Sequence, residues 1–401
     1  MSPQPPNLVV YVSDALRTDH VGCYGARWVH TPTMDAFAAG GVRFAQAIAA
    51  APWTCPSTAS MITGLYPHRH GYLHWDAELD PSFPTLFTVA AALGYETASF
   101  VFDENYLFKG FADANVAGTS ERLDGAVEWL REHRTGPFCL WFHSWATHMP
   151  YDILHADRKE WLQAKEDIIA GIQSDSASAL ESLRESYRRS VERSSEVLFA
   201  SFLEALDDLD LRERTALVLV SDHGESWGER FADKTDVKGT YHLHGATLYD
   251  EVVEVPLVIA APGLPAERVV ASQVSLVDLM PTLVDLAGVP IDGLDGRSLL
   301  PLVDGSESED RPVLIAGTNN GAVSQLALRL PPWKLVHHLE SGTDDAYRLD
   351  LDPRELESRP DDVPDELRAR LDAELADVSR ERLSTEDEAL VERRLADLGY
   401  L

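Results

Sequence analysis

Residues 7–14 read NLVVYVSD, a short apolar run that ends in a serine and an aspartate. An unbroken apolar run of this length is typical of a strand that is buried on both faces of a parallel sheet. Runs of the same kind recur, and we predict strands at Leu8–Val12, Val42–Ile48, Thr97–Phe102, Phe138–His143, Ala216–Val220 and Pro256–Ala260. Stretches with helical spacing separate them, at Met34–Ala39, Pro84–Leu93, Leu123–Glu132 and from about Ser178 to Leu209. This alternation predicts an α/β fold, with a central, mostly parallel sheet flanked by helices.

The character of the sequence changes after about Arg311, where short strand-like segments are joined by turns. We predict strands at Val313–Ala316, Val323–Leu330, Trp333–His338 and Tyr347–Leu349, followed by charged amphipathic helices at Asp365–Val378 and Glu386–Leu398. The expected organisation is therefore a large α/β domain over residues 1–310 and a smaller C-terminal α+β subdomain over residues 311–401, with an antiparallel sheet and terminal helices.

The composition excludes several classes of protein. The chain has 401 residues, with 66 Asp and Glu against 34 Lys and Arg, a formal charge of −32 and an apolar share of 45%. That apolar share is typical of a folded protein with a large core, which excludes a disordered acidic chain. Because such a negative surface repels phosphate backbones and anionic lipids, we expect neither nucleic acid nor a membrane as a partner.

The cysteines and the N-terminus bear on the compartment. Cys23, Cys55 and Cys139 are an odd number and match no disulfide framework or paired zinc motif. The N-terminal residues have no basic patch, and the apolar run Leu8–Val12 is far too short for a secretory or membrane segment. We therefore expect a soluble protein of the cytoplasm, where thiols stay reduced.

Residues of the types that bind metals follow the predicted strands where each strand ends. They are Ser13-Asp14 after the first strand, His143 and His148 at the fourth, Ser221-Asp222-His223-Gly224 after the fifth, and His242 and His244 in the later segment YHLHG. Open α/β sheets bind ligands at the carboxyl ends of their strands, so these side chains are candidates for a metal site. The alternatives are that the acids cap the following helices and that His143 is a buried core histidine.

The segment WTCPSTASMITG, residues 53–64, contains a second candidate. Pro56 fits the first turn of a helix, which places Thr54 and Cys55 at the helix N-terminus, where the helix dipole favours an anion. A hydroxyl in this position is either a nucleophile or an ordinary N-cap.

Several blocks of the sequence resemble the sulfatase-like branch of the alkaline phosphatase superfamily. They are NLVVYVSDALRTDHVGCYG from residue 7, TPTMDAFAAGGVRF from residue 31, CPSTASMITGLYPHRHG from residue 55, SDHGESWGE from residue 221 and HGATLYDEVVEVPLVIAAPG from residue 244. The later segments WKLV and AYRLDLDPRE resemble the small C-terminal sheet of the same branch. The blocks follow the family's order over most of the chain, so the resemblance implies the alkaline phosphatase/sulfatase fold.

The chain departs from sulfatases at the residue that they oxidise to formylglycine. Their motif is Cys-x-Pro-Ser-Arg, and alignment on Pro56-Ser57 places Thr54 at the Cys position and Thr58 at the Arg position. Cys55 directly precedes Pro56 and is therefore one residue too late for the modification. A threonine at this position resembles phospho-transferring relatives such as the nucleotide phosphodiesterases and, around SDHGES, the phosphoethanolamine transferases.

The resemblance also implies roles for individual residues. Asp14, Thr54, Asp222 and His223 match the ligands of one divalent metal, although Asp14-Ala15 replaces the usual Asp-Asp pair. Zinc or manganese suits two carboxylates, an imidazole and a hydroxyl better than calcium does, although calcium is not excluded.

Other residues in the matched blocks are candidates for contact with substrate. His148 and His244 match positions that hold the substrate's anionic oxygens, or a second metal, and each could protonate the leaving oxygen. For Arg17, Arg69 and His70, substrate contact and a structural role both stay open. The loop Asp103-Glu104-Asn105 could influence specificity.

The function that this resemblance implies is a metal-dependent hydrolase or transferase of phosphoesters, whether phosphodiesters, phosphomonoesters or phosphonates. Thr54 would be the nucleophile and would form a phospho-enzyme. The expected partner is an anionic small-molecule ester, and the sequence does not indicate an oligomeric state. The alternatives are an atypical sulfatase without formylglycine and a non-catalytic binding protein that retains the fold.

Overall fold

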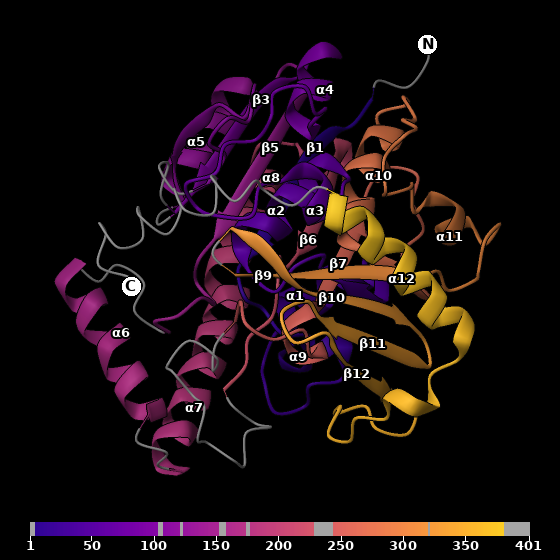
Figure 1. Ribbon diagram of the computed structural model, residues 1–401. Coiled ribbons are helices and arrows are strands. Elements are labelled where there is room, and N and C mark those ends of the chain that lie inside the picture. The colour runs from indigo at the N-terminus through magenta and orange to yellow at the C-terminus, as the bar shows by residue number, and fades with distance from the viewer. Residues whose placement is uncertain are drawn as a thin grey trace.

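The computed structural model describes residues 5–102, 107–120, 123–151, 158–173, 177–227, 244–319 and 321–380. Its centre is an eight-stranded sheet with the strand order β4-β3-β5-β1-β6-β7-β2-β8 (Figure 1). The strands are β1 (Asn7–Ser13), β2 (Val42–Ile48), β3 (Glu96–Val101), β4 (Val116–Thr119), β5 (Phe138–Ser144), β6 (Thr215–Val220), β7 (Glu254–Ala260) and β8 (Arg268–Ser275). All neighbouring pairs are parallel except β6–β7 and β2–β7, where β7 runs antiparallel to both neighbours.

The structure confirms the predicted α/β class and adds two edge strands, β4 and β8, that the sequence analysis did not predict. β4 has only four residues, and β8 is buried at Val270 and at its last three residues but partly or fully exposed at the other four, so it forms no unbroken apolar run. An edge strand has one face or one side in contact with water, so the apolar signal that identifies central strands is weaker there.

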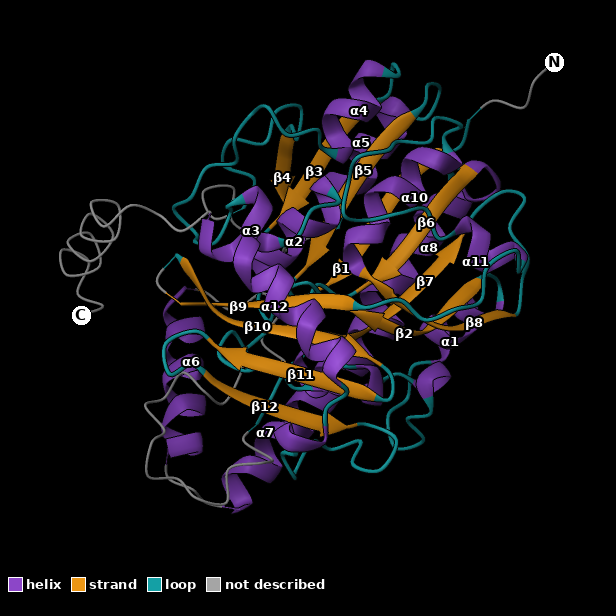
Figure 2. Cartoon of the chain, turned by 45° about the vertical axis from the view of Figure 1, so that its right-hand side comes forward, coloured by secondary structure: helices purple, strands orange, loops and turns teal. Residues whose placement is uncertain are grey.

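Helices cover both faces of this sheet (Figure 2). They are α1 (Pro32–Ala39), α2 (Thr54–Thr63), α3 (Pro67–His70), α4 (Leu86–Ala92), α5 (Asp124–His133), α6 (Arg158–Gln173), α7 (Ala177–Arg193), α8 (Ala200–Asp208), α9 (Asp250–Val253), α10 (Leu279–Leu286), α11 (Leu300–Asp304) and α12 (Asp365–Arg380). Residues of α2, α4 and α10 pack on one face, and residues of α1, α5, α7 and α8 pack on the other. The predicted helical stretch near residues 178–209 is α7 and α8 joined by a π-helical turn, Ser194–Phe199. None of the helices in the described part of the chain combines the length and hydropathy needed to span a membrane.

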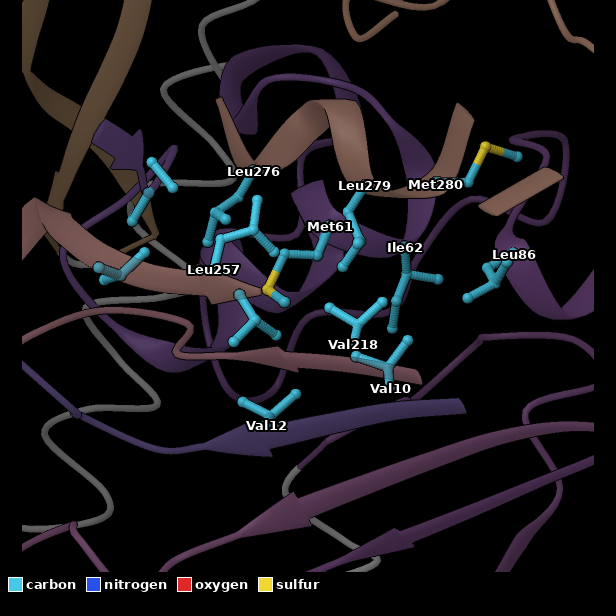
Figure 3. Close-up of a cluster of buried hydrophobic side chains, with 14 of the residues drawn as sticks. Val10, Val12, Met61, Ile62, Leu86, Val218, Leu257, Leu276, Leu279 and Met280 are labelled. Atoms are coloured by element: carbon cyan, nitrogen blue, oxygen red, sulfur yellow. The ribbon is translucent and has the colours of Figure 1, made fainter. Parts of the chain in front are cut away.

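β1 explains why the first apolar run is continuous. Val10 and Val12 point into the core beneath α2, whereas Val9 and Tyr11 point into the core on the opposite face. Figure 3 shows Val10 and Val12 beneath Met61 of α2. Each such side chain contributes about 1.5–3 kcal/mol of transfer free energy when fully buried, so both faces of the strand stabilise the fold.

A second, antiparallel sheet follows in the sequence, with the order β12-β11-β10-β9. Its strands are β9 (Val313–Asn319), β10 (Ala322–Leu330), β11 (Trp333–His338) and β12 (Thr343–Arg348), and α12 packs against β10. The small C-terminal antiparallel sheet is thus confirmed, although its last strand begins earlier than the predicted Tyr347–Leu349. The predicted helix Glu386–Leu398 lies outside the described residues, and the division at residue 310 stays a prediction.

A buried cluster of charges joins the two sheets. Lys334 of β11 is fully buried and pairs with Asp250 at 2.8 Å and with Glu355 at 2.7 Å. Arg329 of β10 pairs with the same Asp250 at 2.9 Å and with Glu254 of β7 at 3.3 Å. Burial alone would lower the pKa of Lys334, but the charges of Asp250 and Glu355 raise it. The cluster therefore has two cations and three carboxylates, and each cation is paired.

We predict that Lys334→Met lowers the free energy of unfolding by about 3–5 kcal/mol, because it leaves buried carboxylates without a partner. Urea titration measures the effect. Lys109→Met is the matched control, since Lys109 forms a surface pair with Asp76 at 3.1 Å and its loss is expected to cost about 0–1 kcal/mol. Equal losses in the two variants would contradict a special role for the buried cluster.

A second prediction concerns Glu254, whose pKa is raised to about 7 by burial and by the charge of Asp250. Between about pH 4.3, the ordinary glutamate value, and pH 7, the folded chain holds a proton that the unfolded chain has released. The free energy of unfolding therefore falls as the pH rises through this window, by about 3–4 kcal/mol.

Glu254→Gln should reduce the slope of that pH dependence, because glutamine does not titrate, while Glu355, whose pKa is also raised to about 7, keeps its own contribution. Urea titrations between pH 5 and 8 measure the slope, and Glu78→Gln, at an exposed position, is the control. A slope that is unchanged in Glu254→Gln would rule out this residue as its source.

Candidate active site

The site lies where three neighbouring parallel strands end. β1 pairs with β5 on one side and with β6 on the other, so Asp14, His143 and Asp222 arrive at the same edge of the sheet. His143 Nε2 lies 2.9 Å from Asp14 Oδ2 and 3.7 Å from Asp222 Oδ2. Ligand atoms of these three residues all lie within 4.8 Å of one another, which is a geometry that can hold a metal ion.

The two carboxylates are suited to a cation. Asp14 and Asp222 are fully buried, and within the described ranges Asp14 Oδ1 and Asp222 Oδ2 accept no hydrogen bond. Burial and the nearby charge of Asp14 raise the pKa of Asp222. Buried carboxylates that repel each other and keep oxygens free of hydrogen bonds fit a divalent ion held between them.

The backbone around these carboxylates is constrained. Ala15 has a φ of 58°, in the left-handed region that alanine rarely adopts, and its N–H donates to Asp222 Oδ1 at 3.3 Å. Gly224 is required for a different reason: a Cβ there would lie 2.2 Å from the carbonyl oxygen of Glu251. The Asp14-Ala15 and Asp222–Gly224 turns therefore hold the two carboxylates in a fixed relation.

Thr54 is the first residue of α2, the helix above this edge, and all ten residues of that helix are buried. Its Oγ1 lies 3.2 Å from His223 Nε2. Ser57 Oγ donates to the carbonyl oxygen of Asp222 at 2.6 Å and so ties the first turn of α2 to the metal-ligand turn. Cys55 belongs to the apolar core beneath the helix. The structure thus brings the hydroxyl of Thr54, rather than the thiol of Cys55, to the candidate metal ligands.

His223 and His143, the two imidazoles near the carboxylates, differ in the hydrogen bonding of Nδ1. His223 Nδ1 lies 2.8 Å from the carbonyl oxygen of Gly224, which can only accept, so Nδ1 carries the proton and Nε2 offers a lone pair. His223 Nε2 lies 3.5 Å from Asp14 Oδ1 and 3.6 Å from Asp222 Oδ2. His143 Nδ1 is buried without a hydrogen-bond partner in the described ranges. A metal-bound imidazole ordinarily donates its other N–H, so His223 is the better ligand, and His143 is better suited to donate to Asp14.

His148 and His244 lie beside this group. The ring of His244 is 4.5 Å from that of His223 and 5.1 Å from that of His148. Burial lowers the pKa of His148 to about 4, and its Nδ1 lies 2.5 Å from the carbonyl oxygen of Met149. Burial opposes protonation of His244, but the charge of Glu225 outweighs it and raises the pKa of His244. The surroundings therefore shift the pKa values of the two histidines in opposite directions, which suits different roles.

The side chains of Arg17 and His70 do not contact the cluster of candidate metal ligands. The guanidinium of Arg17 pairs with Asp19 at 2.7 Å, donates to the carbonyl oxygen of Glu225 at 2.9 Å and lies over the ring of Trp227. It lines a different cavity from the one that His244 lines.

Both ring nitrogens of His70 have partners inside the protein. Nε2 lies 3.0 Å from Ser60 Oγ, and Nδ1 accepts the N–H of Tyr72 at 3.0 Å. Burial lowers its pKa to about 3, so the ring is neutral and braces α2. Arg69 pairs with Asp295. These geometries favour the structural alternative for all three residues from the matched blocks.

Sequence reasoning missed one member of the site, Glu225, and left His143 open between a metal-site candidate and a buried core histidine. The place of His143 at the end of a strand beside β1 is the signal that favours the site. Glu225 lies inside the SDHGES block, yet its contact with His244 depends on a pairing between distant segments. His242 and the loop Asp103-Glu104-Asn105 lie outside the described residues.

The chain is similar to known proteins over most of its length. The family model described as Sulfatase matches residues 6–289, and the model of the N-sulphoglucosamine sulphohydrolase C-terminal region matches residues 242–381. Arylsulfatase K of Mus musculus is 25% identical over 94% of this chain and 79% of its own length. An ulvan-active sulfatase of Formosa agariphila is 27% identical over 78% of this chain and 68% of its own length.

Solved structures show the same fold. The phosphonate monoester hydrolase of Agrobacterium radiobacter superposes with a TM-score of 0.74 at 21% identity, covering 94% of this chain and 96% of its own. A 2-O GAG sulfatase superposes with the same TM-score of 0.74 at 20% identity, covering 94% of this chain and 93% of its own. A phosphonate monoester hydrolase and a sulfatase thus share this fold.

We predict that Asp14→Asn and Asp222→Asn each remove most of the bound divalent metal, because each deletes a charged ligand. His223→Ala should do the same, whereas His143→Ala should weaken binding by about 10–100-fold, as expected for a group that orients a ligand. Elemental analysis and calorimetric titration with Zn²⁺ and Mn²⁺ measure the losses. Asp76→Asn, at a surface ion pair, is the control. A larger loss in His143→Ala than in His223→Ala would reverse the assignment of the two histidines.

Proposed function

Because the chain belongs to the sulfatase family, we propose that it is a metal-dependent hydrolase of anionic esters that uses Thr54 as its nucleophile, with phosphoesters and phosphonate monoesters as the preferred class. The family supports a sulfatase-like hydrolase of this superfamily. The choice of phosphorus over sulfur rests on this chain's own residues.

The position of Thr54 is the observation that carries the proposal. Its hydroxyl lies at the N-terminus of a buried helix, 3.2 Å from His223 Nε2, beside the carboxylates of Asp14 and Asp222. Formylglycine is made from a cysteine, and Cys55 lies in the apolar core. A serine or threonine hydroxyl activated by a metal is the usual alternative nucleophile for attack on phosphorus.

The residues that would hold the metal are Asp14, Asp222 and His223, with Thr54 as the fourth. When bound, a divalent ion supplies positive charge that lowers the pKa of the Thr54 hydroxyl and polarises an ester oxygen. With its proton released to water, Thr54 Oγ1 attacks phosphorus, and the bond from phosphorus to the leaving oxygen breaks. Water then hydrolyses the bond between phosphorus and Thr54 Oγ1 and restores the hydroxyl. The N-terminus of α2 stabilises the developing negative charge. His244, whose pKa is raised, gives a proton to the leaving oxygen.

A cavity beside His244 is large enough for the organic part of a substrate. It has a volume of about 760 Å³, and residues near the edge of the large sheet and residues of the second sheet line it together. Its lining includes Trp53, His244, Thr318, Ser324, Gln325 and His338. Besides one indole ring and two imidazoles, the lining offers hydroxyl and amide groups and the carboxylate of Glu340, which suit a polar alcohol without further negative charge. We therefore expect an anionic small molecule whose leaving alcohol lies in this cavity.

Sulfate esters are the second candidate, because arylsulfatase K and other sulfatases are among the relatives. This candidate needs either direct attack by Thr54 on sulfur or a modified Cys55. Intact-protein mass spectrometry distinguishes the second case, since conversion of a cysteine to formylglycine lowers the mass of the chain.

We predict that Thr54→Ala abolishes turnover of aryl phosphate and phosphonate esters while the fold and most of the metal are retained. Thr54→Ser should keep part of the activity, because it retains a hydroxyl. Steady-state rates on paired aryl phosphate, aryl phosphonate and aryl sulfate esters measure both the nucleophile and the preferred class.

Cys55→Ala is the matched control at the neighbouring residue, and it should stay near the wild-type rate. Full activity of Thr54→Ala would exclude Thr54 as the nucleophile. Turnover of the sulfate ester alone would favour the sulfatase candidate.

A further inference from the structure

We propose that Glu225 is a positioning residue that turns the His244 ring so that its Nε2 faces the leaving oxygen. The inference rests on the proposed function, in which His244 contacts the leaving group. Glu225 itself lies too deep to touch substrate, because its side chain has no exposed surface, whereas 18% of the His244 side chain is exposed.

Both oxygens of the Glu225 carboxylate have specific partners. Oε1 accepts the Nδ1–H of His244 at 3.0 Å, and Oε2 accepts the hydroxyl of Tyr151 at 2.6 Å. The Nε1–H of Trp227 donates to the Tyr151 hydroxyl at 3.3 Å. A fully buried carboxylate is costly unless its oxygens are bound, so this carboxylate is fixed from two sides.

The network fixes the orientation of the His244 ring, which the backbone alone does not determine. The N–H of the next residue, Gly245, donates to the carbonyl oxygen of Pro52 at 2.8 Å, which holds the main chain beside Trp53 and Thr54. The ring can still rotate about its side-chain bonds. The hydrogen bond from Nδ1 to Glu225 selects one orientation and leaves Nε2 as the nitrogen available at the cavity that His244 lines.

The carboxylate also connects segments that are far apart in the chain. Glu225 follows β6, Tyr151 follows β5, and His244 lies nearly twenty residues beyond Glu225. The main-chain oxygen of Glu225 accepts from Arg17 at 2.9 Å, so the segment that carries the carboxylate is itself held to the loop after β1. A rigid support of this kind is what a precisely oriented proton donor requires.

A double-mutant cycle tests the proposal, with Glu225→Ala, Glu225→Gln, His244→Ala and the double variant Glu225→Ala/His244→Ala. Turnover is measured with phenyl and 4-nitrophenyl esters of the class that the wild type hydrolyses. We expect Glu225→Ala to lower kcat about 10–100-fold on the phenyl ester and less on the 4-nitrophenyl ester, whose leaving group needs little protonation. Glu225→Gln keeps an acceptor for Nδ1–H and should restore most of the loss.

The double variant should be no slower than His244→Ala, because Glu225 acts only through that ring. Losses that multiply in the double variant, or that are equal for the two esters, would overturn the proposal. Tyr151→Phe provides a milder change if Glu225→Ala does not fold, and it should show a smaller loss that disappears in the His244→Ala background.

A measurement without turnover separates this inference from the proposed function. The Nδ1–H of His244 should give a downfield proton NMR signal that is absent in His244→Ala and also lost in Glu225→Ala. A signal that persists in Glu225→Ala would overturn the inference whatever the substrate is. A signal that behaves as expected in a chain that hydrolyses none of the esters would leave the positioning contact in place and refute the proposed function.

Discussion

The site depends on the forced proximity of two buried carboxylates, Asp14 and Asp222, at the ends of adjacent parallel strands. The register of β1 against β6 places them together, and the left-handed turn at Ala15 orients them. Burial raises the cost of their mutual repulsion, and within the described residues each keeps an oxygen without a hydrogen bond. A divalent cation would resolve this repulsion, and the nearby Thr54 hydroxyl and imidazoles are arranged around the place where that cation would lie.

The rest of the fold supports this arrangement. Apolar side chains on both faces of β1 fix the strand between two layers of helices, and the fully buried helix α2 holds Thr54 above the carboxylates. The second sheet contributes part of the cavity wall beside His244. It is joined to the large sheet through Lys334 and Arg329. Both pair with Asp250, and Arg329 also pairs with Glu254 of β7. Charge pairing thus positions the C-terminal region relative to the site.

Much of this fold could be predicted from the sequence because central parallel strands are apolar on both faces. The run around β1 and the runs of β5 and β6 carry that signal, and the residues that end them are the site. Edge strand β8 could not be predicted in the same way, because half of its residues face water. The roles of His143 and Glu225 depend on which nitrogen or oxygen meets which partner, and a sequence contains no such distances. Arg17 and His70 show the reverse case, in which residues of a matched block have structural contacts. A matched block does not show whether a side chain faces the site or the interior.

The most direct test of the account is identification of the covalently modified residue during turnover. The enzyme is quenched with acid while it hydrolyses an aryl phosphate or phosphonate ester in excess, digested, and its peptides are analysed by mass spectrometry. The account predicts a phosphoryl or phosphonyl group on Thr54, in the peptide that spans the start of α2. An unmodified Thr54 with the group on another residue, or formylglycine at Cys55 in the resting protein, would contradict it.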